Sequence, residues 1–171
     1  MRINSLSIMS CEALDFELSV ARPVTVLRGR HASLALDLIR EVLGDRSALC
    51  DVNAVDGGHF VIHIDVEIEG KSFSVCYIRN ADGVDGNRIA VNFKQGSTEF
   101  SEVDTLEFIE RCRAMEPTLR PVFIYPSAFG EEGNVRAFMR ALSGAGRQVF
   151  IAISEEFSGI DHANVANVLV G

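Results

Sequence analysis

The chain has 171 residues, of which 47% are hydrophobic and 23% charged, and it carries a formal net charge of −8 with a pI near 5.0. This length and apolar content suit one globular domain with a single core. The acidic balance provides no overall basic field for a polyanion, so direct binding of nucleic acid is disfavoured, although a local basic patch remains compatible with it.

The four cysteines lie far apart in the sequence, and none belongs to a C-x-x-C pair. They are Cys11, Cys50, Cys76 and Cys112. This spacing argues against a zinc site and favours reduced thiols. No apolar run reaches the roughly 18 residues that span a membrane, and the N-terminal residues lack the charged-then-apolar pattern of a signal peptide. The sequence therefore predicts a cytoplasmic protein.

Apolar periodicity divides the first half of the chain into strands and one helix. Alternation of apolar and polar residues predicts antiparallel strands with one buried face. The predicted elements are strands at 2–9, 14–20 and 24–27, a helix at 32–43, and strands at 59–68, 72–78 and 88–94, with loops at 44–58 and 80–87. The first two strands form a predicted hairpin, and the last three form an antiparallel insertion over residues 59–94.

The second half of the chain alternates helices with short, continuously apolar strands, a pattern typical of a sheet that is buried on both faces. The predicted elements are helices at 104–115 and 134–142 and strands at 121–125, 148–153 and 164–170. Pro117 ends the first of these helices. No internal repeat or linker is present, so residues 1–171 are predicted to form a single α/β domain.

Residues 24–43 have the order strand, glycine turn, helix, which matches a phosphate-binding loop of the form G-x-x-x-x-G-K-[ST]. Counting from Gly29, the second glycine, the lysine and the hydroxyl are replaced by Leu34, Ala35 and Leu36. Backbone amides at a helix N-terminus can still bind an anion without the lysine. The candidate contacts are Gly29, Arg30, His31 and Ser33, and a solvated turn is the alternative interpretation. A leucine in the left-handed conformation of the second glycine is unfavourable.

This order of elements resembles the nucleotide-binding domain of ABC-type ATPases, in the branch that includes SMC-like, DNA-repair and prokaryotic AAA-family ATPases. Residues 1–44 are similar to the opening of such a domain, and residues 120–154 are similar to its close. The resemblance implies a P-loop NTPase core with a central, largely parallel sheet flanked by helices, plus an antiparallel β subdomain. It also implies a dimer as the active form, with nucleotide between two domains.

The catalytic motifs of that family are missing. The strand that should end in the Walker B aspartate and glutamate ends in Tyr125 and Pro126, and no carboxylate occurs between residues 117 and 130. Ser154 follows the strand that should precede the switch histidine, and no LSGGQ-like signature precedes the Walker B strand. Gln95 lies where the family places a metal-contacting glutamine. Because lysine, metal and acid act together in phosphoryl transfer, self-contained ATP hydrolysis is not expected.

Other candidate groups have simpler interpretations. His59, His63 and Asp65 share the polar face of one predicted strand and could begin a metal site. Exposed polar residues at the edge of a sheet are the better interpretation, because the sequence shows no third ligand. Glu131 and Glu132 are candidate general bases or surface carboxylates. Ser154 and His162 have no recognisable nucleophile context.

Three functions follow as expectations. The first is a catalytically inactive ABC-ATPase-like domain that serves as a protein-binding or assembly module. It would pair with itself or with an active ABC-type ATPase through the face around Gly29, Ser127 and Glu132. The second is a nucleotide-binding subunit that completes its active site with a partner, and the third is a remnant domain with no small ligand. No cofactor is required by the first, and ATP with Mg²⁺ is disfavoured.

Overall fold

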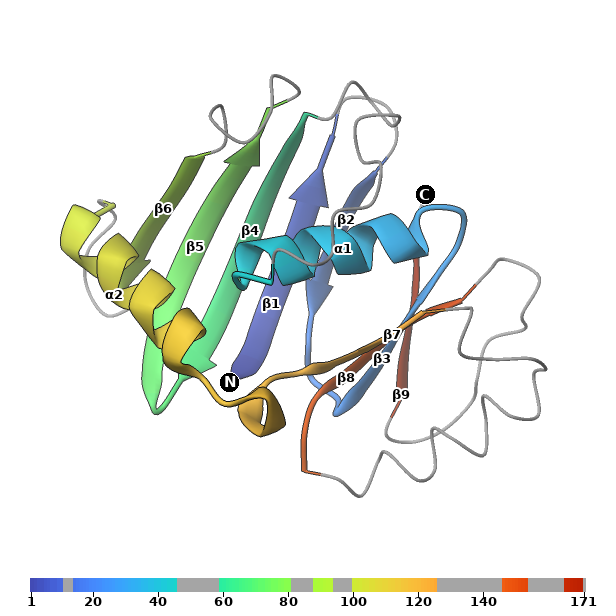
Figure 1. Cartoon of the computed structure of the whole chain (residues 1–171). Helices are drawn as coiled ribbons and strands as arrows, with labels where there is room; N and C mark the ends of the chain where they lie inside the picture. Colours follow the sequence, from blue (N-terminus) through green and yellow to red (C-terminus); the bar gives the residue numbers. More distant parts are fainter. Residues whose placement is uncertain are drawn as a thin grey trace.

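The computed structural model describes residues 1–10, 14–45, 59–80, 88–93, 100–125, 146–153 and 165–170. Within these residues the chain forms two β-sheets with a helix between them (Figure 1). The expected mixed α/β class, with one antiparallel and one parallel sheet, is therefore confirmed.

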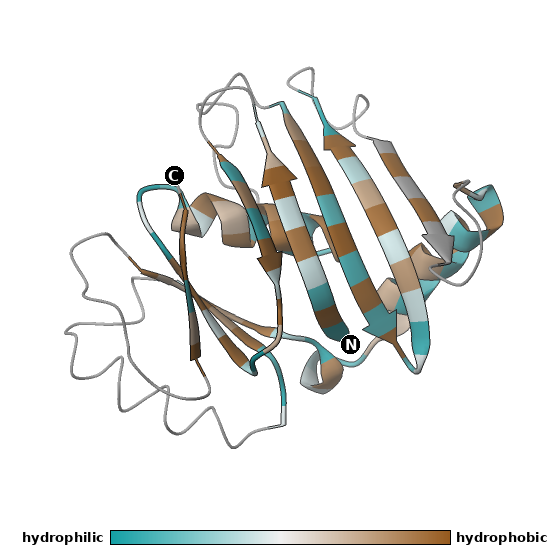
Figure 2. Cartoon of the chain, turned by 180° about the vertical axis from the view of Figure 1, so that it is seen from behind, coloured by the Kyte–Doolittle hydropathy of each residue, from teal (hydrophilic) through white to brown (hydrophobic). Residues whose placement is uncertain are grey.

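The antiparallel sheet has five strands in the order β2-β1-β4-β5-β6. The strands are β1 (Arg2–Met9), β2 (Asp15–Ser19), β4 (Phe60–Ile68), β5 (Lys71–Arg79) and β6 (Arg88–Phe93). The hairpin is confirmed, since Ile8 pairs with Phe16. The same Ile8 also pairs with Ile62, so the predicted insertion and the N-terminal hairpin form one sheet. From behind, brown and teal residues alternate along its strands (Figure 2), as expected for a sheet with one buried face.

The parallel sheet has four described strands in the order β7-β8-β3-β9. They are β3 (Val24–Arg28), β7 (Val122–Ile124), β8 (Val149–Ile153) and β9 (Val165–Leu169). β8, which is continuously apolar, is buried along its whole length. One face of the sheet contributes Leu27 and Phe150 to the main core, and the other carries Val26 and Ile151 in a second cluster. Both faces are thus covered, as parallel sheets require.

Helix α1 (Ala32–Val42) lies between the sheets and is buried on almost every side. Its side chains share the main core with Leu27 of β3 and with Ile64 and Val75 of the antiparallel sheet. A helix with so many buried apolar residues is stable only when other elements cover it. The strand, glycine and helix at residues 24–43 are therefore the structural centre of the molecule.

Helix α2 (Glu102–Ala114) packs beside β6 at the edge of the antiparallel sheet. Its start lies two residues before the predicted one, because the Ser101 side chain caps the helix by accepting a hydrogen bond from the Asp104 amide. Phe108 packs on Phe73 with ring centroids 5.6 Å apart. After the helix, Pro117 begins a short 3₁₀ turn, Pro117–Leu119.

The predicted helix at 134–142 and most of the predicted loops lie outside the described residues. Neither α1 nor α2, the α-helices of the described ranges, combines the length and the apolar run that a membrane crossing would need.

Candidate functional site

The turn between β3 and α1 occupies the place of the predicted phosphate-binding loop. Only three residues, Gly29, Arg30 and His31, separate Arg28 at the end of β3 from Ala32 at the start of α1. The Ala32 amide already bonds to the Gly29 carbonyl at 3.3 Å. The chain thus enters the helix directly, and Leu34 lies within α1 and not in a wide loop.

The main chain of Val170, the residue that follows β9, covers the glycine of this turn. Val170 donates its amide hydrogen to the Arg28 carbonyl at 2.7 Å, and Gly29 donates its own to the Ile153 carbonyl at 3.2 Å. Gly29 has a φ of +137°, and a Cβ placed on it would lie 2.1 Å from the Val170 carbonyl oxygen. Glycine is required here because another backbone approaches it closely. In a phosphate loop, by contrast, a glycine leaves that space to the ligand.

The four predicted contact residues have different surroundings. Gly29 is buried, Arg30 is exposed, and His31 and Ser33 are half-buried in the first turn of α1. His31 is the N-cap residue but makes no side-chain capping bond. Ala35 and Leu36, at the lysine and hydroxyl positions, are completely buried in the core. Catalytic side chains at those two positions would therefore point into the core and away from the turn.

A partly buried polar network joins α1 to Tyr125, the residue that follows β7. The Tyr125 hydroxyl donates to Asp37 Oδ1 at 2.5 Å and accepts from Arg40 Nη1 at 2.8 Å. Arg40 also binds Asp45 Oδ2 through Nε at 3.0 Å and Nη2 at 2.7 Å. Burial and the hydrogen bond to Asp37 raise the pKa of Tyr125 to about 12. The phenol therefore stays protonated and tethers two elements, and it does not act as a base.

This network was missed by the sequence analysis. Its one local signal is Asp37, a carboxylate within an otherwise apolar stretch of α1 that is only 7% exposed. A buried carboxylate requires partners. Those partners come from elsewhere in the chain, and Tyr125 is 88 residues away.

A second polar cluster lies farther along α1. The Tyr77 hydroxyl donates to Glu41 Oε1 at 2.6 Å, and Arg79 Nε lies 3.4 Å from Glu41 Oε2. Arg79 is buried, and its Nε and Nη1 atoms make no hydrogen bond. The cluster links α1 to β5 and offers no nucleophile or metal ligand set.

The polar face of β4 is explained by contacts within the sheet. Asp65 accepts hydrogen bonds from Ser5 Oγ at 2.6 Å and Ser74 Oγ at 2.8 Å. His63 is exposed, with its Nε2 atom 3.9 Å from Cys76 Sγ, and His59 is exposed too. Across the described ranges, no three His, Cys, Asp or Glu residues are placed to hold a metal ion.

Several predicted candidates lie outside the described residues. They are Cys11, Cys50, Gln95, Ser127, Glu131, Glu132, Ser154 and His162. Of the other cysteines, Cys112 is buried and Cys76 half-buried, and both are free thiols.

Comparison of the chain with protein-family models gives no match, and comparison with curated proteins gives none either. The function is therefore argued from geometry and chemistry.

Proposed function

We propose that this chain is an ABC-ATPase-like domain that does not hydrolyse nucleotide and that functions by binding protein. The observation that supports this most directly is the closed turn after β3, where the Val170 carbonyl lies against Gly29. Ala35 and Leu36, at the lysine and hydroxyl positions, are fully buried, which supports the same proposal. The groups that neutralise and position a transferring phosphoryl group are replaced by core packing.

The architecture supports the P-loop part of this proposal. An N-terminal hairpin precedes a strand, turn and helix, antiparallel strands follow, and the chain closes with parallel strands around β3. The carboxyl ends of parallel strands are the usual ligand edge of such sheets. In this chain, the tether between Tyr125 and Asp37 lies where the resemblance places the magnesium-binding acid.

The alternative is a nucleotide-binding subunit that completes its active site with a partner. Exposed Arg30 and half-buried His31 and Ser33 favour it, since they stand at the N-terminus of α1, where a negative charge is stabilised. This alternative requires nucleotide to bind at the turn itself.

Hydrolysis and binding assays on the full chain separate the two. We expect no release of phosphate from Mg-ATP above the buffer rate, and we expect Arg30→Gln to leave any thermal stabilisation by Mg-ATP unchanged. An unrelated active P-loop ATPase serves as positive control. Hydrolysis, or a magnesium-dependent stabilisation that Arg30→Gln removes, would establish the alternative.

The surface that best fits a protein partner lies at the start of α2. Phe100, Val103 and Leu106 are 55%, 72% and 61% exposed. Val103 and Leu106 are three residues apart in α2 and therefore share one side of the helix. Phe100 and Leu106 also border a hollow of about 350 Å³ against β6. The first turn of α2 is acidic and its last turn basic, so two copies packed antiparallel along α2 would bring opposite charges together.

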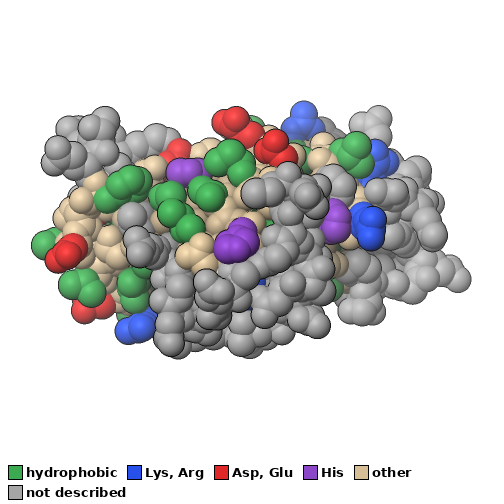
Figure 3. Space-filling view, turned by 90° about the horizontal axis from the view of Figure 1, so that it is seen from above, with side chains coloured by type: hydrophobic (Ala, Val, Ile, Leu, Met, Phe, Trp, Pro, Cys, Tyr) green, Lys and Arg blue, Asp and Glu red, His purple; other side chains and the backbone are tan. Residues whose placement is uncertain are grey.

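A second exposed apolar surface lies on the outer face of the antiparallel sheet. Met9, Val61 and Ile78 are neighbours in register across β1, β4 and β5, and Met9 and Ile78 are 41% and 38% exposed. In the view from above, hydrophobic side chains gather beside histidines (Figure 3). Because these residues are less exposed than those of α2, we assign pairing to α2.

Light scattering after size-exclusion chromatography tests self-pairing. We expect a mass that rises with concentration and that Leu106→Glu lowers toward the monomer. Leu169→Glu is the matched control, because Leu169 is 68% exposed on β9 beside the closed turn. If Leu169→Glu alone dissociates the pair, pairing uses the face around Gly29. A monomer at every concentration contradicts self-pairing.

A further inference from the structure

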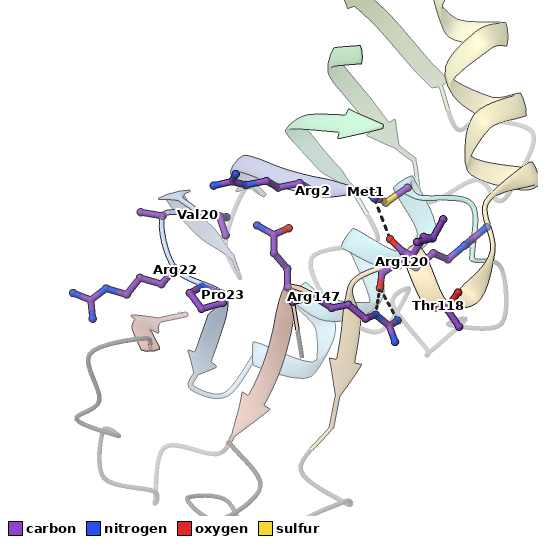
Figure 4. A pocket seen from close by; sticks show the side chains of 12 residues that line it. Met1, Arg2, Val20, Arg22, Pro23, Thr118, Arg120 and Arg147 are labelled. Carbon is purple, nitrogen blue, oxygen red and sulfur yellow. Dashed lines mark hydrogen bonds between the residues drawn. The ribbon is translucent and has the colours of Figure 1, made fainter. Parts of the chain in front are cut away.

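A cavity of about 410 Å³ lies at the end of the parallel sheet opposite the β3–α1 turn. It is bordered by the first residues of β1, the segment before β3, the 3₁₀ turn and the segment before β8. In Figure 4, Arg22 and Pro23 lie on one side of it, Arg120 and Thr118 on the other, and Arg147 between them. The cavity thus sits at the junction of the two sheets.

The charge of this cavity is opposite to that of the chain. Four arginines line it, Arg2, Arg22, Arg120 and Arg147, and among the described lining residues there is no aspartate or glutamate. The whole chain has 16 lysines and arginines against 24 acidic residues. A cavity that gathers a quarter of the basic residues, in a protein of net charge −8, concentrates positive potential that scattered surface arginines would not produce.

Backbone carbonyls accept hydrogen bonds from three of these arginines. Arg147 donates through Nε to the Arg120 carbonyl at 2.9 Å and through Nη2 to the Pro117 carbonyl at 2.9 Å. Arg120 donates to the carbonyls of Cys112 and Met115, and Arg22 to that of Val165 at 3.1 Å. The carbonyl oxygens that hold Arg120 and Arg147 fix these two guanidinium groups but cancel none of their charge. Arg2, Arg120 and Arg147 form no ion pair with a carboxylate of the described residues.

The other walls of the cavity are suited to the organic part of a ligand. Val20, Pro23 and Leu119 supply apolar surface, and Thr118 adds a hydroxyl. The volume falls within the range of small-molecule sites, about 300–1,000 Å³. Guanidinium groups recognise phosphate through paired hydrogen bonds. A polymer is a poorer fit, since the acidic charge outside the cavity would repel a long polyanion.

We propose that this cavity binds a small molecule that carries two or more phosphate charges, with its phosphates among the four arginines and its organic part on Val20, Pro23 and Leu119. The proposal goes beyond protein binding and places the anion site at the amino ends of the parallel strands, away from the turn at Gly29. Since the described lining residues include no carboxylate to hold a metal ion, we expect the free anion to bind there better than its magnesium complex.

Titration calorimetry with inorganic pyrophosphate tests the proposal on the full chain at low ionic strength. We expect binding that weakens with added salt and with added Mg²⁺. Arg2→Gln and Arg22→Gln should each raise the Kd by about tenfold, as expected for the loss of one charged hydrogen bond. These two exposed arginines are chosen because Arg120 and Arg147 hold the 3₁₀ turn together. Circular dichroism melting confirms that each variant is folded.

Arg30→Gln removes an equal charge at the opposite end and locates the site. An unchanged Kd in this variant supports the cavity, whereas a Kd that rises here and not in Arg2→Gln assigns the anion to the turn and overturns the proposal. Absence of pyrophosphate binding overturns it too. Binding of a single-stranded oligonucleotide without binding of pyrophosphate would show a polymer surface instead and equally contradict it.

Discussion

At the scale of residues, the most informative side chain is Tyr125. The Asp37 carboxylate that it binds is buried between α1 and the parallel sheet, with Arg40 Nη1 4.0 Å from Asp37 Oδ1. A buried carboxylate is costly unless hydrogen-bonded, and the phenol supplies that bond while accepting another from Arg40. One tyrosine thus makes a polar position tolerable in the core.

Tyr125→Phe should destabilise the protein by about 1–3 kcal/mol, because the Asp37 carboxylate loses its donor while it remains buried. Urea denaturation measures the change. Tyr77→Phe is the matched control, since the Tyr77 hydroxyl binds Glu41, which is less buried and also faces Arg79. If the two variants lose equal stability, the hydrogen bond to Asp37 contributes no more than the hydrogen bond to Glu41, which contradicts the prediction.

At the scale of elements, the local sequence patterns predicted the strands and helices themselves better than they predicted which strands pair. The alternation in β4 and β5 fixed which face is buried, and the helical spacing gave α1 within one residue at its end. The pairing of β1 with β4 has no local signal, because it depends on which apolar faces meet α1. No local pattern predicts the arginine cavity either, since its four arginines come from four distant segments.

Gly29→Ala should cost more than about 2 kcal/mol, because a Cβ would meet the Val170 carbonyl oxygen in addition to the strain of a positive φ. Gly70→Ala is the control for φ alone. Gly70 has a φ of +78° with nothing within 4 Å of an added Cβ, so about 1 kcal/mol is expected there. Thermal and urea unfolding compare the two, and equal losses would mean that β9 does not close the turn.

Helix α2 is attached to β5 by an ion-pair network whose centre is Glu107. It accepts from Lys71 Nζ at 2.6 Å and from Arg111 Nε at 2.9 Å. The hydrogen bonds from Lys71 and then Arg111 hold the pKa of Glu107 below its usual 4.5. Because the folded pKa lies below the unfolded one, the stabilisation is complete above pH 4.5 and is lost as the pH falls through the folded value.

Glu107→Gln should therefore lower the melting temperature at pH 7 and have a smaller effect as the pH falls through the lowered pKa, where the wild-type carboxylate itself becomes protonated. Melting curves across this range measure the difference. Glu110→Gln, an exposed carboxylate on the same helix, is the control. A difference between wild type and Glu107→Gln that does not change with pH would contradict the assignment.

At the scale of the whole molecule, one side chain joins the two sheets. Gln148 precedes β8 of the parallel sheet, and its amide accepts from the Ile3 N–H at 2.6 Å and donates to the Ile3 carbonyl at 2.7 Å. Ile3 is fully buried and lies beyond the last β1–β2 pair, in which Ser5 faces Ser19. The amide therefore extends the hydrogen bonding of β1 and connects it to the second sheet.

Gln148→Leu should lower the free energy of unfolding by at least about 2 kcal/mol, because two buried backbone groups of Ile3 lose their partner while the volume of the side chain is nearly kept. Urea denaturation gives the magnitude, and amide hydrogen exchange shows where it acts. The Ile3 amide should exchange faster in the variant. The exchange rate of the Leu6 amide, in the same strand, should rise only as much as the lower global free energy of unfolding requires. If Ile3 and Leu6 accelerate equally, Gln148 supports the core in general and is not the connection between the sheets.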